Sequence, residues 1–370
     1  MPNFYSMPLI GHVFYKIIIM KNYFFIICFL SFGTAHSQTI FSNTTKKPIS
    51  NATLISKTGQ ILGISNKEGN ILDFNLIGNT QISSSDTIEI FHTNFETQEL
   101  TGSNFKNNPI LYLNPVQDIE EVVLNAKNPD FVVLKSYYIS YQIIDNEPQS
   151  FSDGIIEYYI SLSKNKIVDY NILESRIFKN VPLINEHYKK LGSTTLSVGS
   201  KIQPFNFHEE ILLNRWGDFT FSKTNEIRLK KDFIGKIEKN ENSSNIFVEY
   251  YTPSRIKEQR MLGLSSKITN YNVSEKFSEL TPSIKSIVSL SKYYKSFISQ
   301  KKIDFKYELI QNVQVLEKKF LTTDDFKKVK TDFNHSEKTK YSYVYWEQEG
   351  LISIPFSVKN LLYNKLTIIN

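Results

Sequence analysis

Alternating apolar and polar positions recur along much of the chain and predict a protein built mainly from β-strands. Between Tyr137 and Ile143 apolar residues occupy every second position, which is the period of a strand with one buried face. Residues 155–162 and 167–178 read as two further strands, so this region predicts the start of an antiparallel meander. Residues 146–154 are predicted to form the turn between the first two strands.

Shorter strand patterns occupy the N-terminal third of the chain. Each contains a few β-forming residues and is bounded by turn residues such as Thr58-Gly59 and Glu68-Gly69-Asn70. Short strands at regular spacing are typical of a β-sandwich. The predicted strands are residues 49–56, 60–64, 71–76, 87–92 and 109–113.

The C-terminal part predicts further strands and three helices. A short helix is expected over residues 181–192, with Gly192 as its stop. After Pro282, apolar residues recur at intervals of three and four through Phe297, which predicts an amphipathic helix. Thr322 is an expected N-cap, with acidic residues following it, for a helix through Lys330. The predicted strands are residues 226–229, 235–238, 246–251, 265–271, 305–315 and 341–347.

The first 37 residues have the pattern of a secretory signal peptide. Lys16 and Lys21 flank Met20, the expected start, and an apolar run over residues 23–32 precedes small residues near position 37. The run is shorter than the roughly 20 residues that cross a bilayer, so a transmembrane anchor is the less favoured alternative. The mature chain is expected to begin near Gln38.

Composition is that of a folded protein without strong charge. Hydrophobic residues make up 41%, charged residues 22% and aromatic residues 14%, and 27 Phe with 21 Tyr favour sheets. Removal of Lys16 and Lys21 lowers the net charge from +6 to +4, and basic residues form no run longer than a pair, so nucleic acid is not an expected partner. Cys28 lies in the signal, so the mature chain has no disulfide or thiolate metal site.

The N-terminal strands also carry a resemblance to a known family. Over residues 47–54, 63–71 and 86–99 the sequence resembles the carboxypeptidase regulatory-like domain, a prealbumin-like β-sandwich that is not catalytic in its relatives. The resemblance implies the first domain of a cell-envelope protein of Bacteroidetes-type bacteria. In place of the family's opening Gly-x-Val strand the chain has Ile40-Phe41-Ser42-Asn43, and Asn94 stands where a late Gly is usual.

Residues 113–126, LNPVQDIEEVVLNA, mark the expected boundary between two domains. We predict a signal peptide over residues 1–37, the carboxypeptidase regulatory-like sandwich over residues 38–124, and a larger antiparallel β-rich domain with a few helices over residues 125–370. The larger domain resembles uncharacterised envelope proteins that carry the same N-terminal module. Its most recognisable pieces are residues 152–159, residues 345–347 and the segment that runs on to Pro355.

His208-Glu209-Glu210 is the only tight group of histidine and carboxylates in the mature sequence. A metal site there needs a further ligand from a distant part of the chain, for which Asp218 and His187 are the candidates. Because such a group arises readily in a chain of this size, a solvated loop is the favoured interpretation, and no cofactor or metal is predicted.

Other candidate chemistries are less specific. Asp153 and Glu157 could act as paired carboxylates in glycoside hydrolysis, but on a strand both could simply face water. The Ser-x-x-Lys spacings at Ser161 and Ser289 lack their supporting motifs, and no phosphate-binding glycine loop occurs. The mixed basic and aromatic residues 292–297 are explained by the predicted helix.

These observations predict a non-enzymatic, exported cell-envelope protein of the periplasm or the outer-membrane periphery. The sandwich is expected to be a docking or spacer module, and the larger domain to bind envelope proteins or an apolar ligand on a curved sheet lined by Tyr and Phe. Two alternatives stay open. They are a hydrolase of envelope polymers and an outer-membrane transport-associated component.

Overall fold

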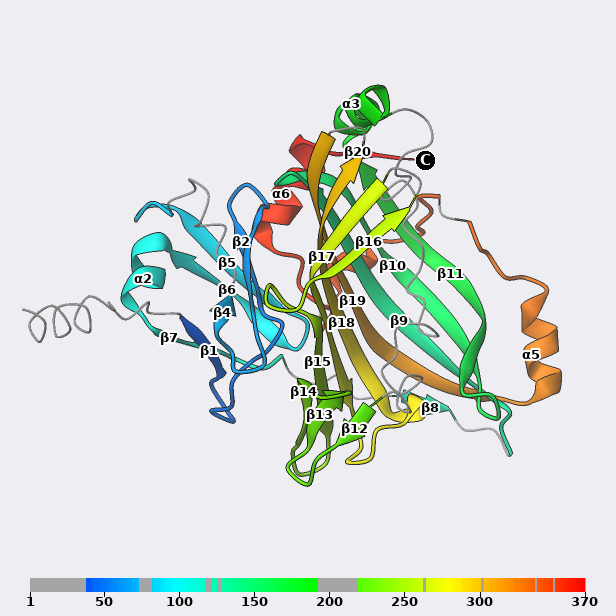
Figure 1. Ribbon diagram of the computed structural model, residues 1–370. Helices are drawn as coiled ribbons and strands as arrows, with labels where there is room; N and C mark the ends of the chain where they lie inside the picture. The colour runs from blue at the N-terminus through cyan, green and yellow to red at the C-terminus, as the bar shows by residue number, and fades with distance from the viewer. Residues whose placement is uncertain are drawn as a thin grey trace, which may run out of the picture. The chain divides into compact units, whose positions relative to one another are not determined.

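The computed structural model describes residues 38–72, 82–116, 122–124, 128–191, 219–261, 264–300, 303–336, 338–348 and 350–369. They belong to one compact unit, Gln38–Asn370. The predicted signal peptide, residues 1–37, lies outside the described residues. The described chain forms three sheets and a few helices, which confirms a mainly β protein with an N-terminal sandwich and a larger antiparallel sheet (Figure 1).

The N-terminal part is a small sandwich of two sheets. Its elements are β1 (Thr39–Ser42), β2 (Thr53–Ser56), β3 (Ile61–Ser65), β4 (Ile71–Leu72), β5 (Thr87–His92), β6 (Phe95–Thr101), α2 (Gly102–Asn107) and β7 (Ile110–Leu113). Five strands form one sheet in the order β4-β3-β2-β5-β6, and β1 pairs with β7 in parallel. Leu54 and Ile88 from the first sheet pack with Leu111 from the second and Phe105 from α2, so one apolar core joins the two sheets.

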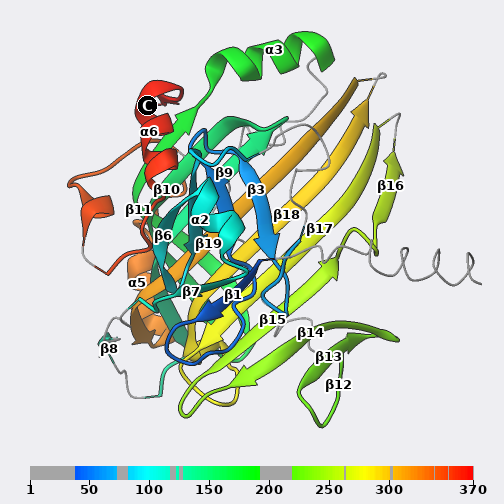
Figure 2. The ribbon, with the colours of Figure 1, turned by 90° about the vertical axis from the view of Figure 1, so that its left-hand side faces the viewer.

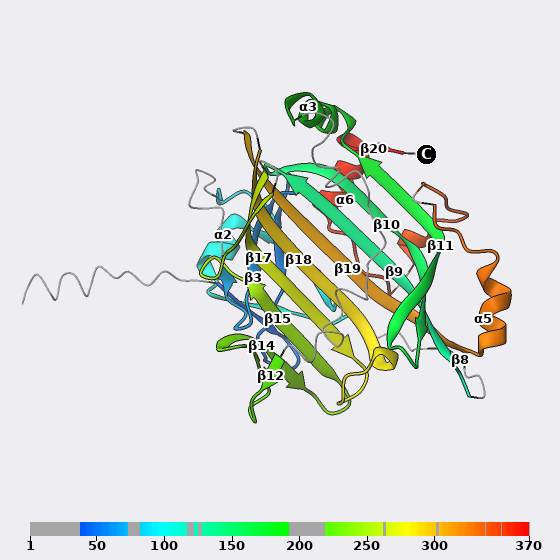
Figure 3. The same cartoon turned by 45° about the vertical axis from the view of Figure 1, so that its right-hand side comes forward.

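The larger sheet has 13 strands in the described residues. Eleven follow the order β12-β13-β14-β15-β17-β18-β19-β9-β10-β11-β20, while β16 pairs with β17 and β8 with β19 (Figures 2 and 3). The strands are β8 (Val122–Leu124), β9 (Phe131–Ile144), β10 (Glu147–Ser161), β11 (Lys166–Lys179), β12 (Phe219–Phe221), β13 (Glu226–Leu229), β14 (Asp232–Lys239), β15 (Ser244–Tyr251), β16 (Lys257–Met261), β17 (Leu264–Phe277), β18 (Ile287–Gln300), β19 (Ile303–Leu321) and β20 (Thr367–Ile368). The predicted meander over β9, β10 and β11 is confirmed.

The described helices other than α2 are α3 (Val181–Leu191), α5 (Thr323–Lys330) and α6 (Phe356–Asn364), with short 3₁₀ turns η3 (Ile284–Ser286) and η4 (Tyr345–Glu347). Two predicted helices are confirmed as α3 and α5. Thr322 caps α5 as expected, because its side chain accepts a hydrogen bond from the Asp325 backbone N–H at 3.2 Å. The predicted stop at Gly192 lies outside the described residues.

The predicted helix over residues 282–297 is wrong, because residues 287–300 form strand β18. β18 pairs with β17 on one side and β19 on the other along nearly its whole length. Leu290 belongs to the apolar core on one face of the sheet and Tyr293 to the core on the other. A strand with apolar residues on both faces can mimic the three-and-four spacing of a helix, so the helical explanation of residues 292–297 is also wrong.

Three smaller predictions are corrected by the sheet pairing. The turn before β10 is only Asp145-Asn146, whose φ angles of 50° and 69° suit a tight hairpin, so residues 147–154 are strand. β9 has both faces buried rather than one, since Ser140 and Gln142 are buried as well. Residues 341–347 are not a strand and contain η4.

The predicted boundary stretch, residues 113–126, contains strands of two different sheets. Leu113 ends β7 of the sandwich. Val122–Leu124 forms β8, which pairs in parallel with Glu317–Lys319 of the large sheet. The chain therefore passes from one sheet to the other within this stretch.

One face of the large sheet, here called the docked face, packs against the sandwich. Tyr137 and Tyr293 define this face, and they share one apolar core with Ile61 and Phe91 of the sandwich and Val358 of α6. Packing these apolar side chains together removes their surface from water, which favours the contact between the sandwich and the sheet. The sandwich is therefore fixed to the sheet by an apolar interface rather than by a few surface contacts.

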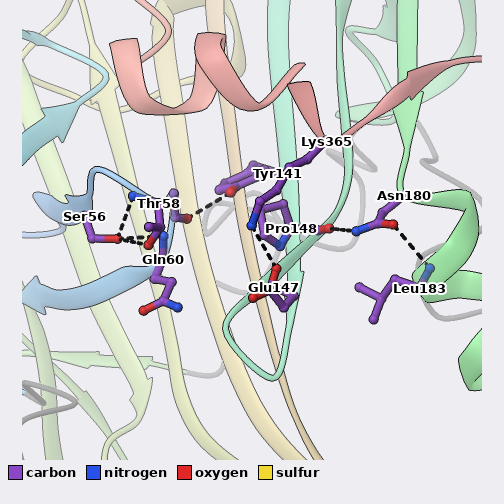
Figure 4. A network of polar contacts seen from close by, with 10 residues as sticks. Ser56, Thr58, Gln60, Tyr141, Glu147, Pro148, Asn180, Leu183 and Lys365 are labelled. Carbon is purple, nitrogen blue, oxygen red and sulfur yellow. Dashed lines mark hydrogen bonds and ion pairs between the residues drawn. The ribbon is translucent and has the colours of Figure 1, made fainter. Parts of the chain in front are cut away.

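The sandwich turn that contains Gly59 packs closely against the large sheet and α6, and this close packing requires a glycine. Ser56 Oγ accepts hydrogen bonds from the backbone of the turn, including Gln60 N at 3.1 Å, and Gly59 has a φ of +78° (Figure 4). The Tyr141 hydroxyl of β9 donates to the Gly59 carbonyl at 2.9 Å. A Cβ at Gly59 would collide with Leu361 Cδ1, so the turn fits against both the sheet and α6 only without a side chain.

Glu89 of the sandwich caps a helix from the other end of the chain. The N-cap position of α6 is Pro355, which makes no side-chain cap hydrogen bond. Glu89 Oε1 accepts from Phe356 N at 2.5 Å and Oε2 accepts from Ser357 N at 2.8 Å and from the Ser357 hydroxyl. A carboxylate at this position also interacts favourably with the helix dipole. The contact ties β5 to the C-terminal segment.

Candidate functional site

The sequence-predicted metal candidates His208, Glu209 and Asp218 lie outside the described residues. The further candidate His187 is on α3, where its ring stacks near Phe305 with centroids 6.4 Å apart. Among the described residues no three His, Cys, Asp or Glu side chains are grouped as metal ligands. The structure therefore places His187 in an aromatic contact with Phe305 and in no metal-ligand group of the described residues.

Two other histidines have clear structural contacts. His92 is buried and its Nδ1 accepts a hydrogen bond from Asn94 N at 3.0 Å. Burial lowers the pKa of His92 from 6.5 to about 4, against the opposing effect of a backbone hydrogen bond with Ser50. The imidazole is thus neutral at pH 7. His335 is exposed, and its Nε2 lies 2.8 Å from Asp169 Oδ1.

The structure gives Asp153 and Glu157 different environments. Asp153 is fully buried, so the expectation that both carboxylates could face water is wrong. Glu157 is partly buried and accepts hydrogen bonds from the Tyr159 hydroxyl at 2.8 Å and from Asn171 Nδ2 at 3.2 Å.

Asp153 is the centre of a polar cluster on the docked face. Arg176 donates to both carboxylate oxygens, and the Tyr137 hydroxyl donates to Oδ2 at 3.0 Å. The Tyr345 hydroxyl donates to the Asp153 carbonyl at 3.0 Å and lies 3.2 Å from Oδ1. Trp346 covers the other side of Arg176, whose guanidinium carbon is 3.5 Å from the ring centroid. Both carboxylate oxygens and the guanidinium are therefore engaged.

Burial shifts the pKa values of the two tyrosines in this cluster. Burial, together with the Asp153 charge, raises the pKa of Tyr137 and of Tyr345 well above the usual value, so both hydroxyls remain donors. The two sequence pieces singled out as most recognisable, residues 152–159 and 345–347, meet here. Arg176 was not predicted as a functional residue, although a lone basic residue inside an apolar strand pattern is a signal for a buried partner.

The two Ser-x-x-Lys spacings do not form dyads. Ser161 Oγ accepts from the Lys164 backbone N–H at 3.4 Å, which is a turn contact. Ser289 donates to Asn94 Oδ1 at 2.8 Å on the docked face. Since residues three apart on a strand point to opposite faces, Lys292 is on the other side of the sheet from Ser289.

A row of tyrosine rings crosses the opposite face of the large sheet, here called the tyrosine face. It is formed by Tyr250, Tyr271, Tyr294 and Tyr307, which come from β15, β17, β18 and β19. Successive ring centroids are 5.1, 6.0 and 5.9 Å apart, within the range of favourable aromatic pairs. Burial raises the pKa of Tyr307, so its hydroxyl stays protonated. The sequence predicted an aromatic-lined sheet but not this row.

The row continues into an apolar cluster near one end of the face. Tyr294 and Tyr307 pack with Ile298, Phe305 and Leu309. Ser296 lies directly across from Tyr307 in the strand pairing and therefore on the same face. Its hydroxyl is completely buried and has no hydrogen-bond partner among the described residues. A buried hydroxyl of this kind can accept or donate one hydrogen bond to a polar atom placed against it.

Comparisons with known proteins give no family. No family model matches the chain. No curated protein matches it. Among solved structures, one concerned with lipid–protein interactions in lipovitellin is similar at a TM-score of 0.21 and 10% identity, over 63% of this chain and 28% of that chain. A match at this TM-score establishes neither a common fold nor a common function.

Among the described residues no helix is both long enough and apolar enough to cross a membrane.

Proposed function

We propose that the protein is an exported, non-enzymatic binding protein of a bacterial cell envelope, and that the tyrosine face binds an apolar ligand that carries a polar group. The observation that supports this most directly is the row of four tyrosine rings across four adjacent strands. Aromatic rings offer large, rigid apolar contact area with a polar edge. Binding surfaces for small ligands combine such rings with a few placed polar groups.

Ser296 provides the polar element of this proposal. Its buried hydroxyl is on the same face as the row, beside Tyr307, and a polar ligand atom there would satisfy it. The apolar cluster around Ile298 and Leu309 would then contact the ligand's hydrocarbon part. Apolar contact favours binding by about 25 cal/mol for each Å² removed from water.

The sandwich serves, in this proposal, as a docking module of the carboxypeptidase regulatory-like type. The turn at Glu68-Gly69, where Gly69 has a φ of +77°, supports the resemblance. The shared core with Tyr293 and the Glu89 contact to α6 support a sandwich that is fixed to the sheet. A partner that binds the sandwich would thereby hold the ligand-binding sheet in a defined orientation.

The test uses the mature chain, purified from an envelope fraction. Organic extraction followed by mass spectrometry is expected to release an apolar compound, and the extracted protein is expected to bind a fluorescent fatty acid. Tyr294→Ser removes the ring that contacts both Tyr271 and Tyr307 and should weaken probe binding by about tenfold or more. Tyr112→Ser, at an exposed tyrosine of β7, is the matched control and should bind normally.

A mature protein that yields no extractable compound and does not bind the fatty acid would contradict the proposal. If the Tyr294→Ser and Tyr112→Ser variants bound the probe equally well, the probe would bind outside the tyrosine face. Affinity capture from envelope extracts separates a protein partner from a lipid ligand in the same preparation.

A further inference from the structure

A cavity lies on the docked face, near the ends of two strand hairpins. Its volume is about 520 Å³, within the size range of small-ligand sites. β16 and β17 form one hairpin and β18 and β19 the other, and they lie side by side in the sheet (Figure 2). The lining residues used below are Ile256, Glu258, Arg260, Lys267, Phe297 and Asp304.

Strand register places these side chains in two rows on one face. In the first row, Glu258 of β16 is opposite Lys267 of β17, which is opposite Phe297 of β18. In the second row, Arg260 of β16 is opposite Ser265 of β17. Ser265 is in turn opposite Ser299 of β18, and Ser299 is opposite Asp304 of β19. Directly opposed residues share a face, and so do residues two apart on a strand. The rows are therefore neighbours on the same surface.

Four charged side chains of the two rows form no ion pair with one another or with other described residues. None of the ion pairs in the described residues involves the two basic and two acidic side chains that line the cavity, which are Arg260, Lys267, Glu258 and Asp304. Arg260 and Asp304 stand at opposite ends of the second row, with two serines between them. The second row thus has a basic residue at one end and an acidic residue at the other, and Glu258 of the first row lies beside Arg260 and opposite Lys267.

Two large apolar side chains that line the cavity are exposed. Phe297 is 45% exposed and Ile256 is 40% exposed, although both are large apolar side chains. Lys295 lies on the same strand face, with Nζ 5.9 Å from the Phe297 ring centroid. An exposed apolar patch with a polar rim is the usual composition of a binding surface.

We propose that this cavity binds a short zwitterionic peptide with an apolar side chain. Arg260 and Lys267, which are diagonal neighbours on β16 and β17, bind the peptide carboxylate, since a guanidinium can donate two parallel hydrogen bonds to it. Asp304 accepts from the terminal ammonium group. Phe297 and Ile256 contact the apolar side chain, and the two serines are within the span of the peptide backbone.

The spacing of the strands sets the length of this ligand. Arg260 and Asp304 are three strand intervals apart, which corresponds to roughly 14 Å between backbones at about 4.8 Å per interval. An extended peptide spans about 3.3–3.6 Å per residue, so about three residues fit between the two charged groups. A free amino acid is too short to reach both ends.

The test is calorimetric titration of the mature chain with the tripeptide alanyl-phenylalanyl-alanine. A second titration uses the same tripeptide with an acetylated N-terminus and an amidated C-terminus. The free tripeptide is expected to bind, and blocking both ends should weaken binding by about tenfold or more, because both charge-assisted contacts are lost. Arg260→Gln and Asp304→Asn should each weaken binding of the free tripeptide by roughly fivefold.

Arg228→Gln, at an arginine of β13 outside the cavity, is the matched control and should leave tripeptide binding unchanged. Thermal unfolding of each variant shows that it is folded, which is expected because Arg260 and Asp304 are exposed and Arg228 is partly exposed. The proposal is overturned if the free tripeptide does not bind at millimolar concentration, if the blocked tripeptide binds equally well, or if Arg260→Gln and Asp304→Asn bind as the unmodified chain does.

Discussion

Arg176 and Asp153 are directly opposed on β11 and β10 and form a buried, two-point ion pair. Arg176 Nε donates to Asp153 Oδ1 at 2.9 Å and Nη2 donates to Oδ2 at 2.5 Å. The exposed fractions of the two side chains are 3% and 0%. Taking both charges out of water is costly, and the cost is offset only while every hydrogen bond is made. Asp153, which the sequence offered as a candidate catalytic carboxylate, therefore takes part in an ion pair on which the stability of the fold depends.

Replacing Arg176 by Met should destabilise the protein strongly. It leaves the Asp153 charge buried without its partner, for which a loss of about 3–5 kcal/mol in the free energy of unfolding is expected. Urea unfolding of the mature chain measures this loss. The double variant Arg176→Met with Asp153→Leu removes both charges and should recover a large part of it. A double variant less stable than Arg176→Met alone would contradict this explanation.

Replacing Glu89 by Ala should loosen α6. The helix then loses the acceptor for the Phe356 and Ser357 backbone N–H groups, and a loss of about 2 kcal/mol in unfolding free energy is expected. Amide hydrogen exchange in α6 should become faster. Glu99, directly opposite Glu89 on β6, is exposed and makes a matched control. If Glu99→Ala had the same effect, capping would not be the cause.

His92 should make stability depend on pH between about 4 and 6.5. Because burial lowers its folded pKa from 6.5 to about 4, the unfolded chain binds a proton in this window that the folded chain does not bind. The contribution is complete above pH 6.5 and is lost as pH falls towards the folded pKa of about 4. In total it is about 3 kcal/mol.

Urea unfolding at several pH values tests the histidine. The variant His92→Asn should show a flatter pH dependence in this window than the unmodified chain. An unchanged slope in His92→Asn would assign the pH dependence to other groups.

Replacing Thr322 by Ala should fray α5. The variant loses the hydroxyl that accepts from Asp325 N, which is expected to cost about 1 kcal/mol. Hydrogen exchange at the Asp325 amide is the direct measurement. Thr322→Ser keeps the hydroxyl and should behave as the unmodified chain does, whereas equal exchange in the Ala and Ser variants would rule out the cap.

Local signals in the sequence predicted the local elements well. The N-cap at Thr322 acts through a residue only three positions away, so the sequence pattern alone was sufficient. The two-residue period over residues 137–143 likewise identified β9, because alternate side chains on a strand pack into one core. The second face of β9 could not be predicted, since Ser140 and Gln142 are buried and lie opposite residues of β19, far away in the chain.

The predicted helix after Pro282 failed for a tertiary reason. Apolar residues at Leu290, Tyr293 and Tyr294 lie on two faces of one strand, and both faces are packed. Pairing with β17 and β19 supplies the backbone hydrogen bonds that a helix would otherwise form internally. A sequence window of a dozen residues does not contain those partners.

The sequence by itself determined that the chain is mainly β, that it has short strands before longer ones, and that Tyr and Phe line its sheets. The tertiary structure alone decided which side chains meet. Asp153, offered by the sequence as a carboxylate that could face water, is buried against Arg176 and Tyr345 from other segments. The tyrosine face and the charged cavity at Arg260 likewise arise from register between strands, which depends on long-range pairing and not on local composition.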